Sequence, residues 1–427
     1  MRSRRGIFLL ASGRCVRGAA VWASFLCLLL LQIHLYFSSG PLSVALVAGA
    51  GLLAVIAALI GFGAFRTCLD VPLIAYSGIG LVSAIVNGVT PAWSATLAVV
   101  PLYYGLAYAI RNPFRLRLTL ACTVICQVLV GVLALYYHAS VGFERRSEIP
   151  YLAVSQWSGY PEVGFLEALA IPAAFAMVVA GPTHLARVVG LLLSAIIAAV
   201  ALGLSSRGAW VAAGAAFLAV AGIGVMRFRQ GMLALMLPIA VAMIVGAWHW
   251  SPLFRQLILG FLPAPGAPDD RMDVMKATLV LIRDHPWFGV GLGQFQHALA
   301  DTDVARRAAY ATAHAHNMYL HVAAEMGIPA LLAFLWLWWT VLRSLVQGLA
   351  SDDRLDLVRL GLLGSVVAFM ARGLTDNFLG GLATSLRFNV VLWTMFAMVA
   401  SFDRLQKGRC AMAPAPRPDD APAVSPA

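Results

Sequence analysis

The sequence predicts an all-α, polytopic integral membrane protein with about 12 transmembrane helices. Three observations predict this fold class. Of the 427 residues, 61% are hydrophobic and only 11% are charged, whereas soluble domains carry roughly 25% charged residues. The apolar residues form runs of about 18–22, the length that crosses a hydrocarbon core of roughly 30 Å. These runs also lack the polar stripe that a helix in a soluble bundle presents to water.

Hydropathy divides the chain into a basic arm, a series of spans and a polar tail. The arm, residues 1–18, carries several arginines, and the apolar run after it is too long for a signal peptide. The tail, residues 404–427, is rich in Pro and Ala and is predicted to be disordered. The predicted spans are 19–37, 42–64, 71–87, 92–110, 118–137, 164–181, 188–204, 209–226, 231–250, 327–345, 360–375 and 387–403.

Charge at the ends of the spans predicts the orientation. One set of loops carries a large excess of Lys and Arg, and the other set is nearly balanced. Because the basic side of a membrane protein faces the cytoplasm, both termini are predicted to be cytoplasmic. The predicted order is a nine-span bundle (19–250), a large periplasmic loop (251–316) and a three-span bundle (317–403). The pI of about 9.8 therefore reflects topology and requires no nucleic-acid partner.

The large outer loop is predicted to contain an amphipathic helix from Arg271 to Asp284. Acidic residues precede this segment, which suits the positive end of a helix dipole, and His285-Pro286 ends it. Its apolar residues at helical spacing are Met272, Met275, Leu279 and Ile282. We expect this helix to lie on the membrane surface or to pack over the bundle.

Two arginines are candidate anion ligands on the outer side. Arg207 lies between two spans, in Ser206-Arg207-Gly208-Ala209-Trp210, and Arg271 begins the predicted loop helix. A guanidinium group matches phosphate oxygens with two parallel hydrogen bonds. The alternatives are an arginine that reaches lipid headgroups for Arg207 and a solvated surface charge for Arg271. The outer side also carries Arg145, Arg146, Arg372 and Arg387, which either extend this anion-binding surface or contact headgroups.

His314 and His316 stand at the mouth of a span and are candidates for proton transfer, although an isolated histidine pair more often has a structural role. The pKa of histidine lies near neutrality, so an imidazole can accept a proton from a hydroxyl group. As a metal site the pair is incomplete, because the sequence shows no third ligand. The Asp301-Thr302-Asp303 tripeptide matches the DxD of metal-dependent glycosyltransferases but is common by chance. The run Gly289–Gly293 lacks the spacing and the preceding strand of a dinucleotide-binding loop.

Taken together, these motifs resemble the O-antigen ligase and polymerase superfamily of bacterial membrane glycosyltransferases. The resemblance covers roughly residues 190–345 and departs from the family where Asp270 precedes Arg271. It rests on Ser206–Trp210, on Arg271 with Asp284-His285-Pro286-Trp287-Phe288-Gly289-Val290-Gly291-Leu292-Gly293-Gln294-Phe295, and on His316-Asn317-Met318-Tyr319-Leu320 with Glu325-Met326-Gly327-Ile328-Pro329.

The resemblance implies a GT-C-like fold and an O-antigen ligase in the bacterial inner membrane, with its active site on the periplasmic side. Its partners would be a glycan on undecaprenyl pyrophosphate, the lipid A core as acceptor, and membrane lipids. His316 would be the general base, and Arg207 and Arg271 would hold the pyrophosphate. His314 would orient a substrate or act as the base itself. This inverting scheme needs no metal and no cofactor.

Three other functions share features with this one. An O-antigen polymerase and a protein O-oligosaccharyltransferase use the same donor and differ in the acceptor. A transporter or flippase for lipid-linked sugars belongs to another class. Transporters typically carry charges at the middle of the membrane and paired broken helices, whereas the candidate residues here gather at the outer ends of spans. The sequence therefore favours an enzyme.

Overall fold

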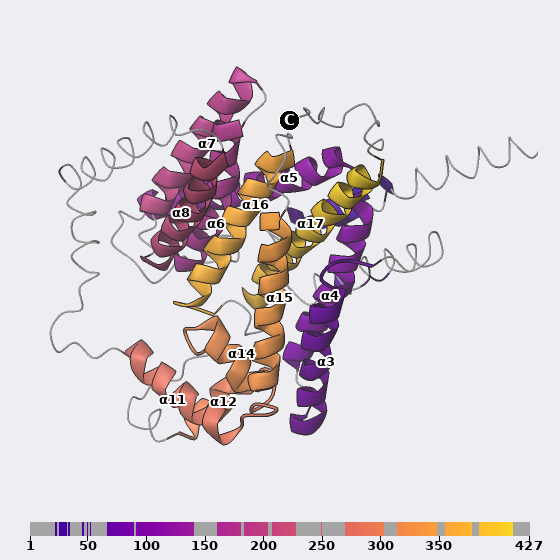
Figure 1. The fold of residues 1–427 in the computed structure, drawn as a ribbon. Coiled ribbons are helices and arrows are strands. Elements are labelled where there is room, and N and C mark those ends of the chain that lie inside the picture. Colours follow the sequence, from indigo (N-terminus) through magenta and orange to yellow (C-terminus); the bar gives the residue numbers. More distant parts are fainter. Residues whose placement is uncertain are drawn as a thin grey trace, which may run out of the picture.

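The computed structural model describes nine stretches of the chain. They are residues 66–88, 91–140, 160–180, 183–203, 207–227, 270–302, 314–347, 355–377 and 384–412, together with short runs and single positions between 22 and 52 and the single residue 249. Every regular element in these stretches is a helix, as Figure 1 shows. The helices are α3 (Asp70–Asn87), α4 (Pro91–Ala109), α5 (Pro113–Ser140), α6 (Tyr160–Ala180), α7 (His184–Gly203), α8 (Arg207–Arg227), α11 (Asp270–Asp284), α12 (Phe295–Ala300), α14 (Met318–Met326), α15 (Ile328–Gln347), α16 (Leu355–Gly373) and α17 (Thr384–Met412).

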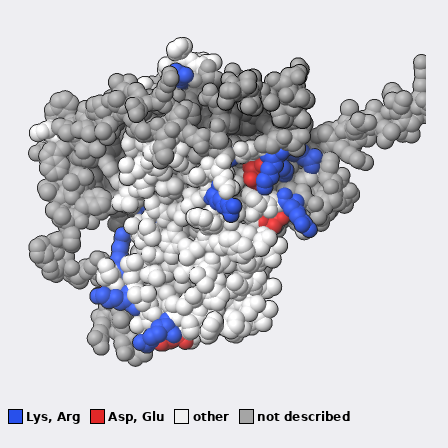
Figure 2. Space-filling view, in the orientation of Figure 1, with Lys and Arg blue, Asp and Glu red and all other residues white. Residues whose placement is uncertain are grey.

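The described helices support a helical membrane protein. Five of them, α3, α5, α7, α15 and α17, are long and apolar enough to cross a membrane. Lys, Arg, Asp and Glu gather near the ends of the described part, around α11 and beside the α4–α5 turn, with uncharged surface between them (Figure 2). The predicted spans 19–37, 42–64 and 231–250 lie outside the continuously described residues, so the count of about 12 stays a prediction.

Elsewhere the helices begin and end close to the predicted spans, with three differences. α5 and α16 begin earlier, at Pro113 and Leu355 instead of 118 and 360, and α17 differs at its C-terminal end. α17 continues to Met412, so the first residues of the segment predicted to be a disordered tail are helical. A lysine in this extension pairs with the carboxylate at the end of the predicted span: Lys407 Nζ lies 2.8 Å from Asp403 Oδ2. Ion pairs at this spacing stabilise a helix by a few tenths of a kcal/mol.

Small residues bring α6 and α16 into close contact on the left of the bundle in Figure 1. A Cβ atom at Gly364 would overlap Pro172, and one at Gly361 would lie 3.0 Å from the Cα atom of Ala173. Helices in membranes associate through this kind of close backbone approach, because lipid removes the hydrophobic gain that drives packing in water. α6 also packs against α5, α7 and α8, while α17 packs against α4 and α15 against α3.

A smaller apolar core joins α11, α12 and α14 at the lower end of Figure 1. It contains Val274, Ala277 and Leu281 of α11, Phe295 and Leu299 of α12, and Ala315 and Ala324. Met272 and Leu279, two of the apolar residues expected to face the membrane surface or the bundle, are not part of this core, and their contact with a membrane stays a prediction. Met272 and Leu279 are 49% and 54% exposed, because α11 is apolar on two sides and α14 covers the side that carries Val274 and Leu281.

Candidate active site

Asn317 ties the beginning of α14 to the end of α16. Its side-chain oxygen accepts hydrogen bonds from the backbone N–H groups of Tyr319 and Leu320 at 2.9 and 3.0 Å, so it is the N-cap of α14. Its Nδ2 donates to the carbonyl oxygen of Leu374 at 3.2 Å. This one residue therefore places the segment before α14, which contains His314 and His316, beside the segment after α16.

The two predicted histidines meet a carboxylate and an arginine at this junction. Nδ1 of His316 lies 3.6 Å from Oδ1 of Asp376, and Nδ1 of His314 lies 3.8 Å from the same oxygen. Oδ2 of Asp376 accepts a hydrogen bond from Nη2 of Arg372 at 2.8 Å. We call these four residues the histidine–aspartate cluster. Their side chains range from 3% exposed at Arg372 to 29% at His314, so the cluster is largely withdrawn from water but remains open to a ligand.

The backbone at His316 is unusual. Its φ is +50°, and it is the only residue other than glycine with a positive φ in the described part of the chain. Side chains other than glycine seldom adopt this conformation, which costs roughly 1–3 kcal/mol when imposed by its surroundings. The imidazole rings of His314 and His316 stand nearly perpendicular, with centroids 4.5 Å apart. The local fold thus holds two histidines against one carboxylate at a cost in strain.

The surroundings shift the titration of His314 and of Asp376. Burial lowers the pKa of His314 to about 4; Asp376 opposes this shift, and His316, His321 and Arg271 add to it. Burial alone would raise the pKa of Asp376, but the polar contact with His316 and the charges of Arg372 and both histidines hold it well below its usual range. At neutral pH, therefore, Asp376 is a carboxylate and His314 is uncharged.

The arginine motif of α8 also reaches the cluster. A Cβ atom at Gly208 would overlap the guanidinium group of Arg372, so Arg372 lies directly on the backbone at the beginning of α8. Arg207 is the first residue of α8, but its side chain is not among those that the structure describes. Arg271, in the first turn of α11, is exposed and close enough to His314 to affect its pKa. The structure thus brings segments near residues 207, 271, 314 and 376 to one place.

Several residues of this site lie in a segment of the chain that matches a known protein family. Residues 191–335 match the family model described as O-antigen ligase. This segment belongs to the O-antigen ligase family. The match confirms the resemblance found in the sequence, and it contains Arg207, Arg271, His314 and His316. No curated protein matches the chain.

Two residues of the cluster lie beyond the segment that matches the O-antigen ligase family. Arg372 was one of several outer arginines in the sequence, and Asp376 was not predicted. Its only signal was the spacing of Arg372 and Asp376, four apart at the end of a span, which is typical of a helical ion pair. Among the other outer arginines, Arg145 and Arg146 lie outside the described residues, as does the side chain of Arg387.

The glycine-rich run, which lies inside the segment that matches the O-antigen ligase family, contacts the end of α14. Gly289, Gly291 and Gly293 all have positive φ, at 66°, 103° and 76°. Oε1 of Glu325 accepts hydrogen bonds from the N–H groups of Gly293 and Phe295, at 2.9 and 3.3 Å. Backbone hydrogen bonds also join Val290 and Gly291 to the carbonyl groups of Ala324 and Glu325. We call residues 289–293 the glycine clasp, and it fixes the end of α11 to α14.

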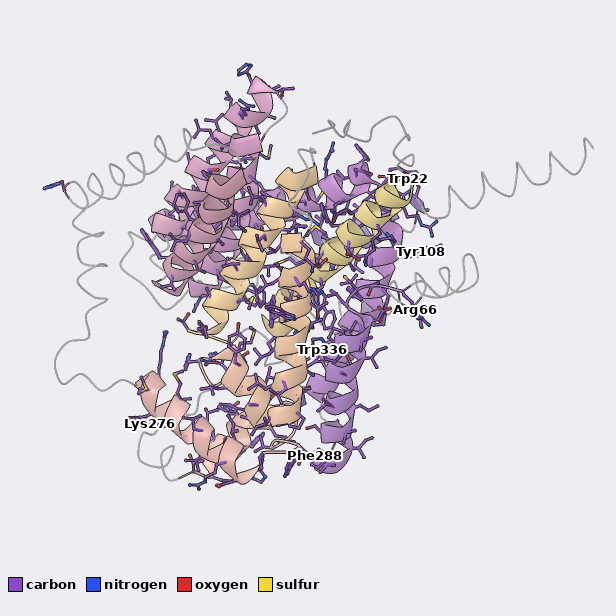
Figure 3. The ribbon with its side chains drawn as sticks, viewed as in Figure 1. Trp22, Arg66, Tyr108, Lys276, Phe288 and Trp336 are labelled. Atoms are coloured by element: carbon purple, nitrogen blue, oxygen red, sulfur yellow. The ribbon has the colours of Figure 1, made fainter. Side chains whose placement is uncertain are left out.

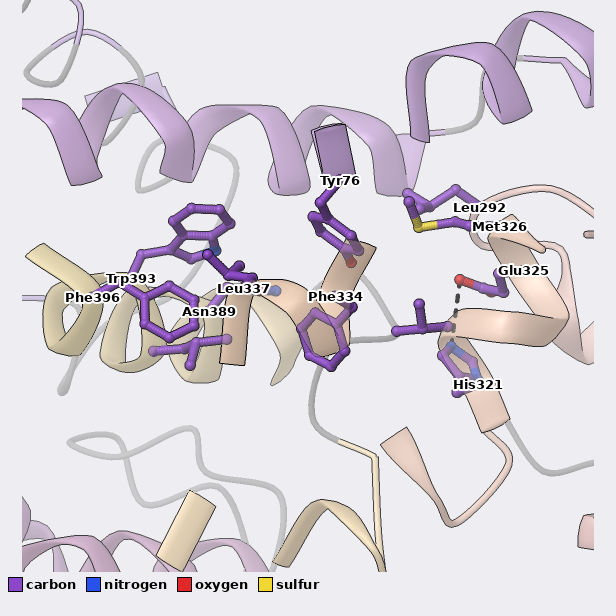
Figure 4. Close-up of a pocket in the computed structure, with 12 residues that line it drawn as sticks. Tyr76, Leu292, His321, Glu325, Met326, Phe334, Leu337, Asn389, Trp393 and Phe396 are labelled. Carbon is purple, nitrogen blue, oxygen red and sulfur yellow. Dashed lines mark ion pairs between the residues drawn. The ribbon is translucent and has the colours of Figure 1, made fainter. Parts of the chain in front are cut away.

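A buried contact between Glu325 and His321 supports the glycine clasp from inside. Oε2 of Glu325 lies 3.4 Å from Nε2 of His321, as the dashed line in Figure 4 shows. Both side chains border a cavity of about 30 Å³ among α3, α14, α15 and α17, which Tyr76 and Asn389 also line. That volume suits about one water molecule. His321 therefore has a structural role and is separate from the histidine–aspartate cluster.

Replacing Gly208 with alanine is expected to lower glycan transfer by about 10- to 100-fold, by misplacing catalytic groups. The new methyl group would push Arg372 away from Asp376, and Arg372 cannot yield easily because it is buried and bonded to Thr375 and Asp376. Gly214→Ala, on the same helix, is the control, because a Cβ atom there meets nothing within 4 Å. Transfer by membranes with equal amounts of each variant checks this; equal activities would contradict it.

Proposed function

We propose that the protein transfers a glycan from undecaprenyl pyrophosphate to a sugar hydroxyl of the lipid A core, on the periplasmic side of the inner membrane. The observation that supports this most is the histidine–aspartate cluster beside the beginnings of α8 and α11. A base backed by a carboxylate and bordered by cationic groups is what transfer from a pyrophosphate to a hydroxyl requires. Membership of residues 191–335 in the O-antigen ligase family supports the same reaction class.

In this proposal His316 is the general base. It takes the proton of the acceptor hydroxyl while that oxygen attacks the anomeric carbon, and the carbon–oxygen bond to the pyrophosphate breaks with inversion. Asp376 lies at Nδ1 of His316, which leaves Nε2 for the substrate and stabilises the imidazolium that forms. The 3.6 Å separation is longer than a hydrogen bond, and such contacts commonly tighten when substrate binds.

His314 fits the role of base less well. With a pKa of about 4, its imidazole accepts a proton weakly at neutral pH, and a base works best when its pKa lies near the operating pH. As a neutral ring it also adds no positive charge for the pyrophosphate. We assign it to orienting the acceptor through hydrogen bonds, beside His316.

Arg207 and Arg271 hold the pyrophosphate in this proposal. The leaving group gains negative charge as the sugar bond breaks, and fixed cations in a partly dry site stabilise that charge strongly. Arg271 supplies positive potential at His314, and Arg207 begins α8, whose N-terminal N–H groups also attract anions. Arg372 lies on that same helix end but is already paired with Asp376, so its main role is to position the carboxylate.

We expect transfer to survive treatment with a chelator. His314, His316 and Asp376 do offer three ligand atoms within 4.8 Å of one another, so a divalent cation is a real alternative. However, Arg372 contacts the same carboxylate at 2.8 Å, and its charge opposes a cation there. Transfer measured before and after EDTA, followed by added Mg²⁺, Mn²⁺ or Zn²⁺, checks this. Loss of transfer on chelation, with recovery by one cation, would contradict this prediction. It would also favour Asp301-Thr302-Asp303 as the metal-binding motif of a metal-dependent glycosyltransferase. Asp303 lies outside the described residues.

Deletion of the gene, followed by gel analysis of lipopolysaccharide, tests the function as a whole. For a ligase, we expect an uncapped lipid A core, with polymerised chains retained on the carrier lipid. Core capped with a single repeat would instead indicate a polymerase, and normal lipopolysaccharide with unglycosylated proteins would indicate an oligosaccharyltransferase. A flippase defect would leave the lipid-linked glycan inaccessible from the periplasm. Each of these three outcomes would overturn the ligase proposal.

A further inference from the structure

Three arginines gather at the turn between α4 and α5. Arg111 lies in the turn, Arg115 lies in the first turn of α5, and Arg404 lies near the end of α17. All three bond to the last carbonyl groups of α4. Arg404 Nη2 donates to Ala107 at 2.8 Å and to Ile110 at 2.5 Å, Arg111 Nε donates to Tyr108 at 3.3 Å, and Arg115 Nη1 donates to Ala109 at 2.7 Å.

These carbonyl groups neutralise the site only in part. The C-terminal end of a helix carries roughly half an elementary negative charge, whereas each guanidinium group carries a full positive charge at any physiological pH. Arg115 is also only 4% exposed, and its Nε has no hydrogen-bond partner within the described residues. A buried donor without an acceptor costs roughly 1–3 kcal/mol, and more when charged. The turn therefore gathers three guanidinium groups at one helix end, and one of them, Arg115, has a buried donor, unused among the described residues, that an anion would satisfy.

Aromatic side chains place this turn at the membrane interface. The Arg115 guanidinium stacks 3.9 Å above the ring of Trp22, and the rings of Trp22 and Phe114 have centroids 6.4 Å apart. These rings are 39% and 62% exposed. Tryptophan concentrates where lipid headgroups meet the hydrocarbon core. Figure 3 shows Trp22 and Tyr108 at one end of the molecule, with Lys276 and Phe288 at the other, so this turn is remote from α11 and the glycine clasp.

We propose that the α4–α5 turn binds the phosphate of an anionic phospholipid, with Arg111, Arg115 and Arg404 on the phosphate oxygens. Trp22 and Phe114 contact the glycerol and the first acyl carbons. The planar guanidinium fork matches phosphate oxygens, and a lipid phosphate reaches this level of the bilayer together with apolar chains for the exposed rings. In the orientation predicted from charge, this end faces the cytoplasmic leaflet, where anionic lipids create a negative surface potential. The proposal is independent of the transfer reaction.

Thermal unfolding of the full-length protein in detergent tests this site. We expect phosphatidylglycerol to raise the unfolding midpoint, and phosphatidylcholine or inorganic phosphate at the same concentration to leave it unchanged. Arg111→Gln should weaken the apparent affinity for phosphatidylglycerol by about tenfold, the loss expected for one charge-assisted contact. Arg111 is chosen because it is partly exposed, whereas Arg115 is buried and caps α4. Retention of lipid in native mass spectra gives a second measurement that does not depend on stability.

Arg117→Gln is the matched control. Arg117 lies on the same helix end and is exposed, so its replacement removes one positive charge from the same interface without touching α4. We expect it to bind phosphatidylglycerol as the unaltered protein does. An equal loss in Arg117→Gln would show a general surface-charge effect and overturn the site. Equal stabilisation by inorganic phosphate would indicate a site for free anions. No stabilisation by phosphatidylglycerol would indicate that the turn does not bind this lipid. Either result would overturn the proposal.

Discussion

Replacing His316 with alanine is expected to lower glycan transfer by about 10³-fold, within the range that a positioned general base contributes. Without the imidazole, the acceptor hydroxyl must lose its proton to water as it attacks. Asp376 cannot substitute, because its neighbours hold its pKa well below its usual range. The measurement is the rate of glycan transfer from lipid-linked donor to purified lipid A core in detergent, at equal amounts of inserted protein.

Two variants make the result for His316 interpretable. His297→Ala removes an exposed histidine from α12 and should leave transfer unchanged. Asp376→Asn keeps the shape of the side chain but removes the charge behind His316, and we expect a loss of about 10- to 100-fold, smaller than that of His316→Ala. Activity of His316→Ala within tenfold of the unaltered protein would remove His316 from the role of base. If His314→Ala abolished transfer in that case, His314 would take its place.

Replacing Arg271 with alanine is expected to lower transfer by about 10² to 10³-fold, as when one preorganised charge is removed from a developing anion. Arg271→Lys should recover little activity, because a lysine contacts phosphate as a point charge and lacks the planar fork. The matched control is Arg283→Ala on the same helix. Arg283 is exposed and pairs with Asp284 at 2.9 Å, so its loss should leave transfer intact.

The same pair of substitutions at Arg207 separates a phosphate ligand from an arginine that only reaches lipid headgroups. We expect Arg207→Ala to lose transfer as severely as Arg271→Ala and Arg207→Lys to recover little. Donor binding, followed with radiolabelled lipid-linked glycan, should weaken in parallel. Normal donor turnover in either alanine variant would count against that arginine as a ligand of the pyrophosphate.

Much of the helical framework could be predicted from the sequence because long apolar runs leave little choice of structure in a membrane. α3, α7 and α15 begin and end within a few residues of the predicted spans. α11 was predicted from spacing and end signals, yet its buried face was not, since a helix that is apolar on two sides does not reveal which side meets protein. Val274 and Leu281 are buried because α14 lies there, which only the tertiary structure decides.

The candidate site was predicted in part for a similar reason. Arg207, Arg271 and His316 stand in local motifs that are visible along the chain. Asp376 stands 60 residues after His316 in sequence, in a short segment whose importance comes from the bond between Asn317 and Leu374. The left-handed backbone of His316 was not predicted either, because only a few per cent of residues other than glycine adopt it and the tertiary structure decides which ones.

The glycine clasp makes α11 and α14 a single cooperative unit. Amide groups of Val290 and Gly291 donate to the carbonyl groups of Ala324 and Glu325, at 2.8 and 3.0 Å, while the Glu325 side chain bonds back to the clasp. Segments joined in this way unfold together, so neither can open alone at low cost in free energy. A local fluctuation that released α11 would also have to unwind the end of α14. The distance between the helix that carries Arg271 and the segment that carries His316 is therefore protected against local unfolding. In the proposed reaction, a lipid-linked substrate would meet these two groups already in place.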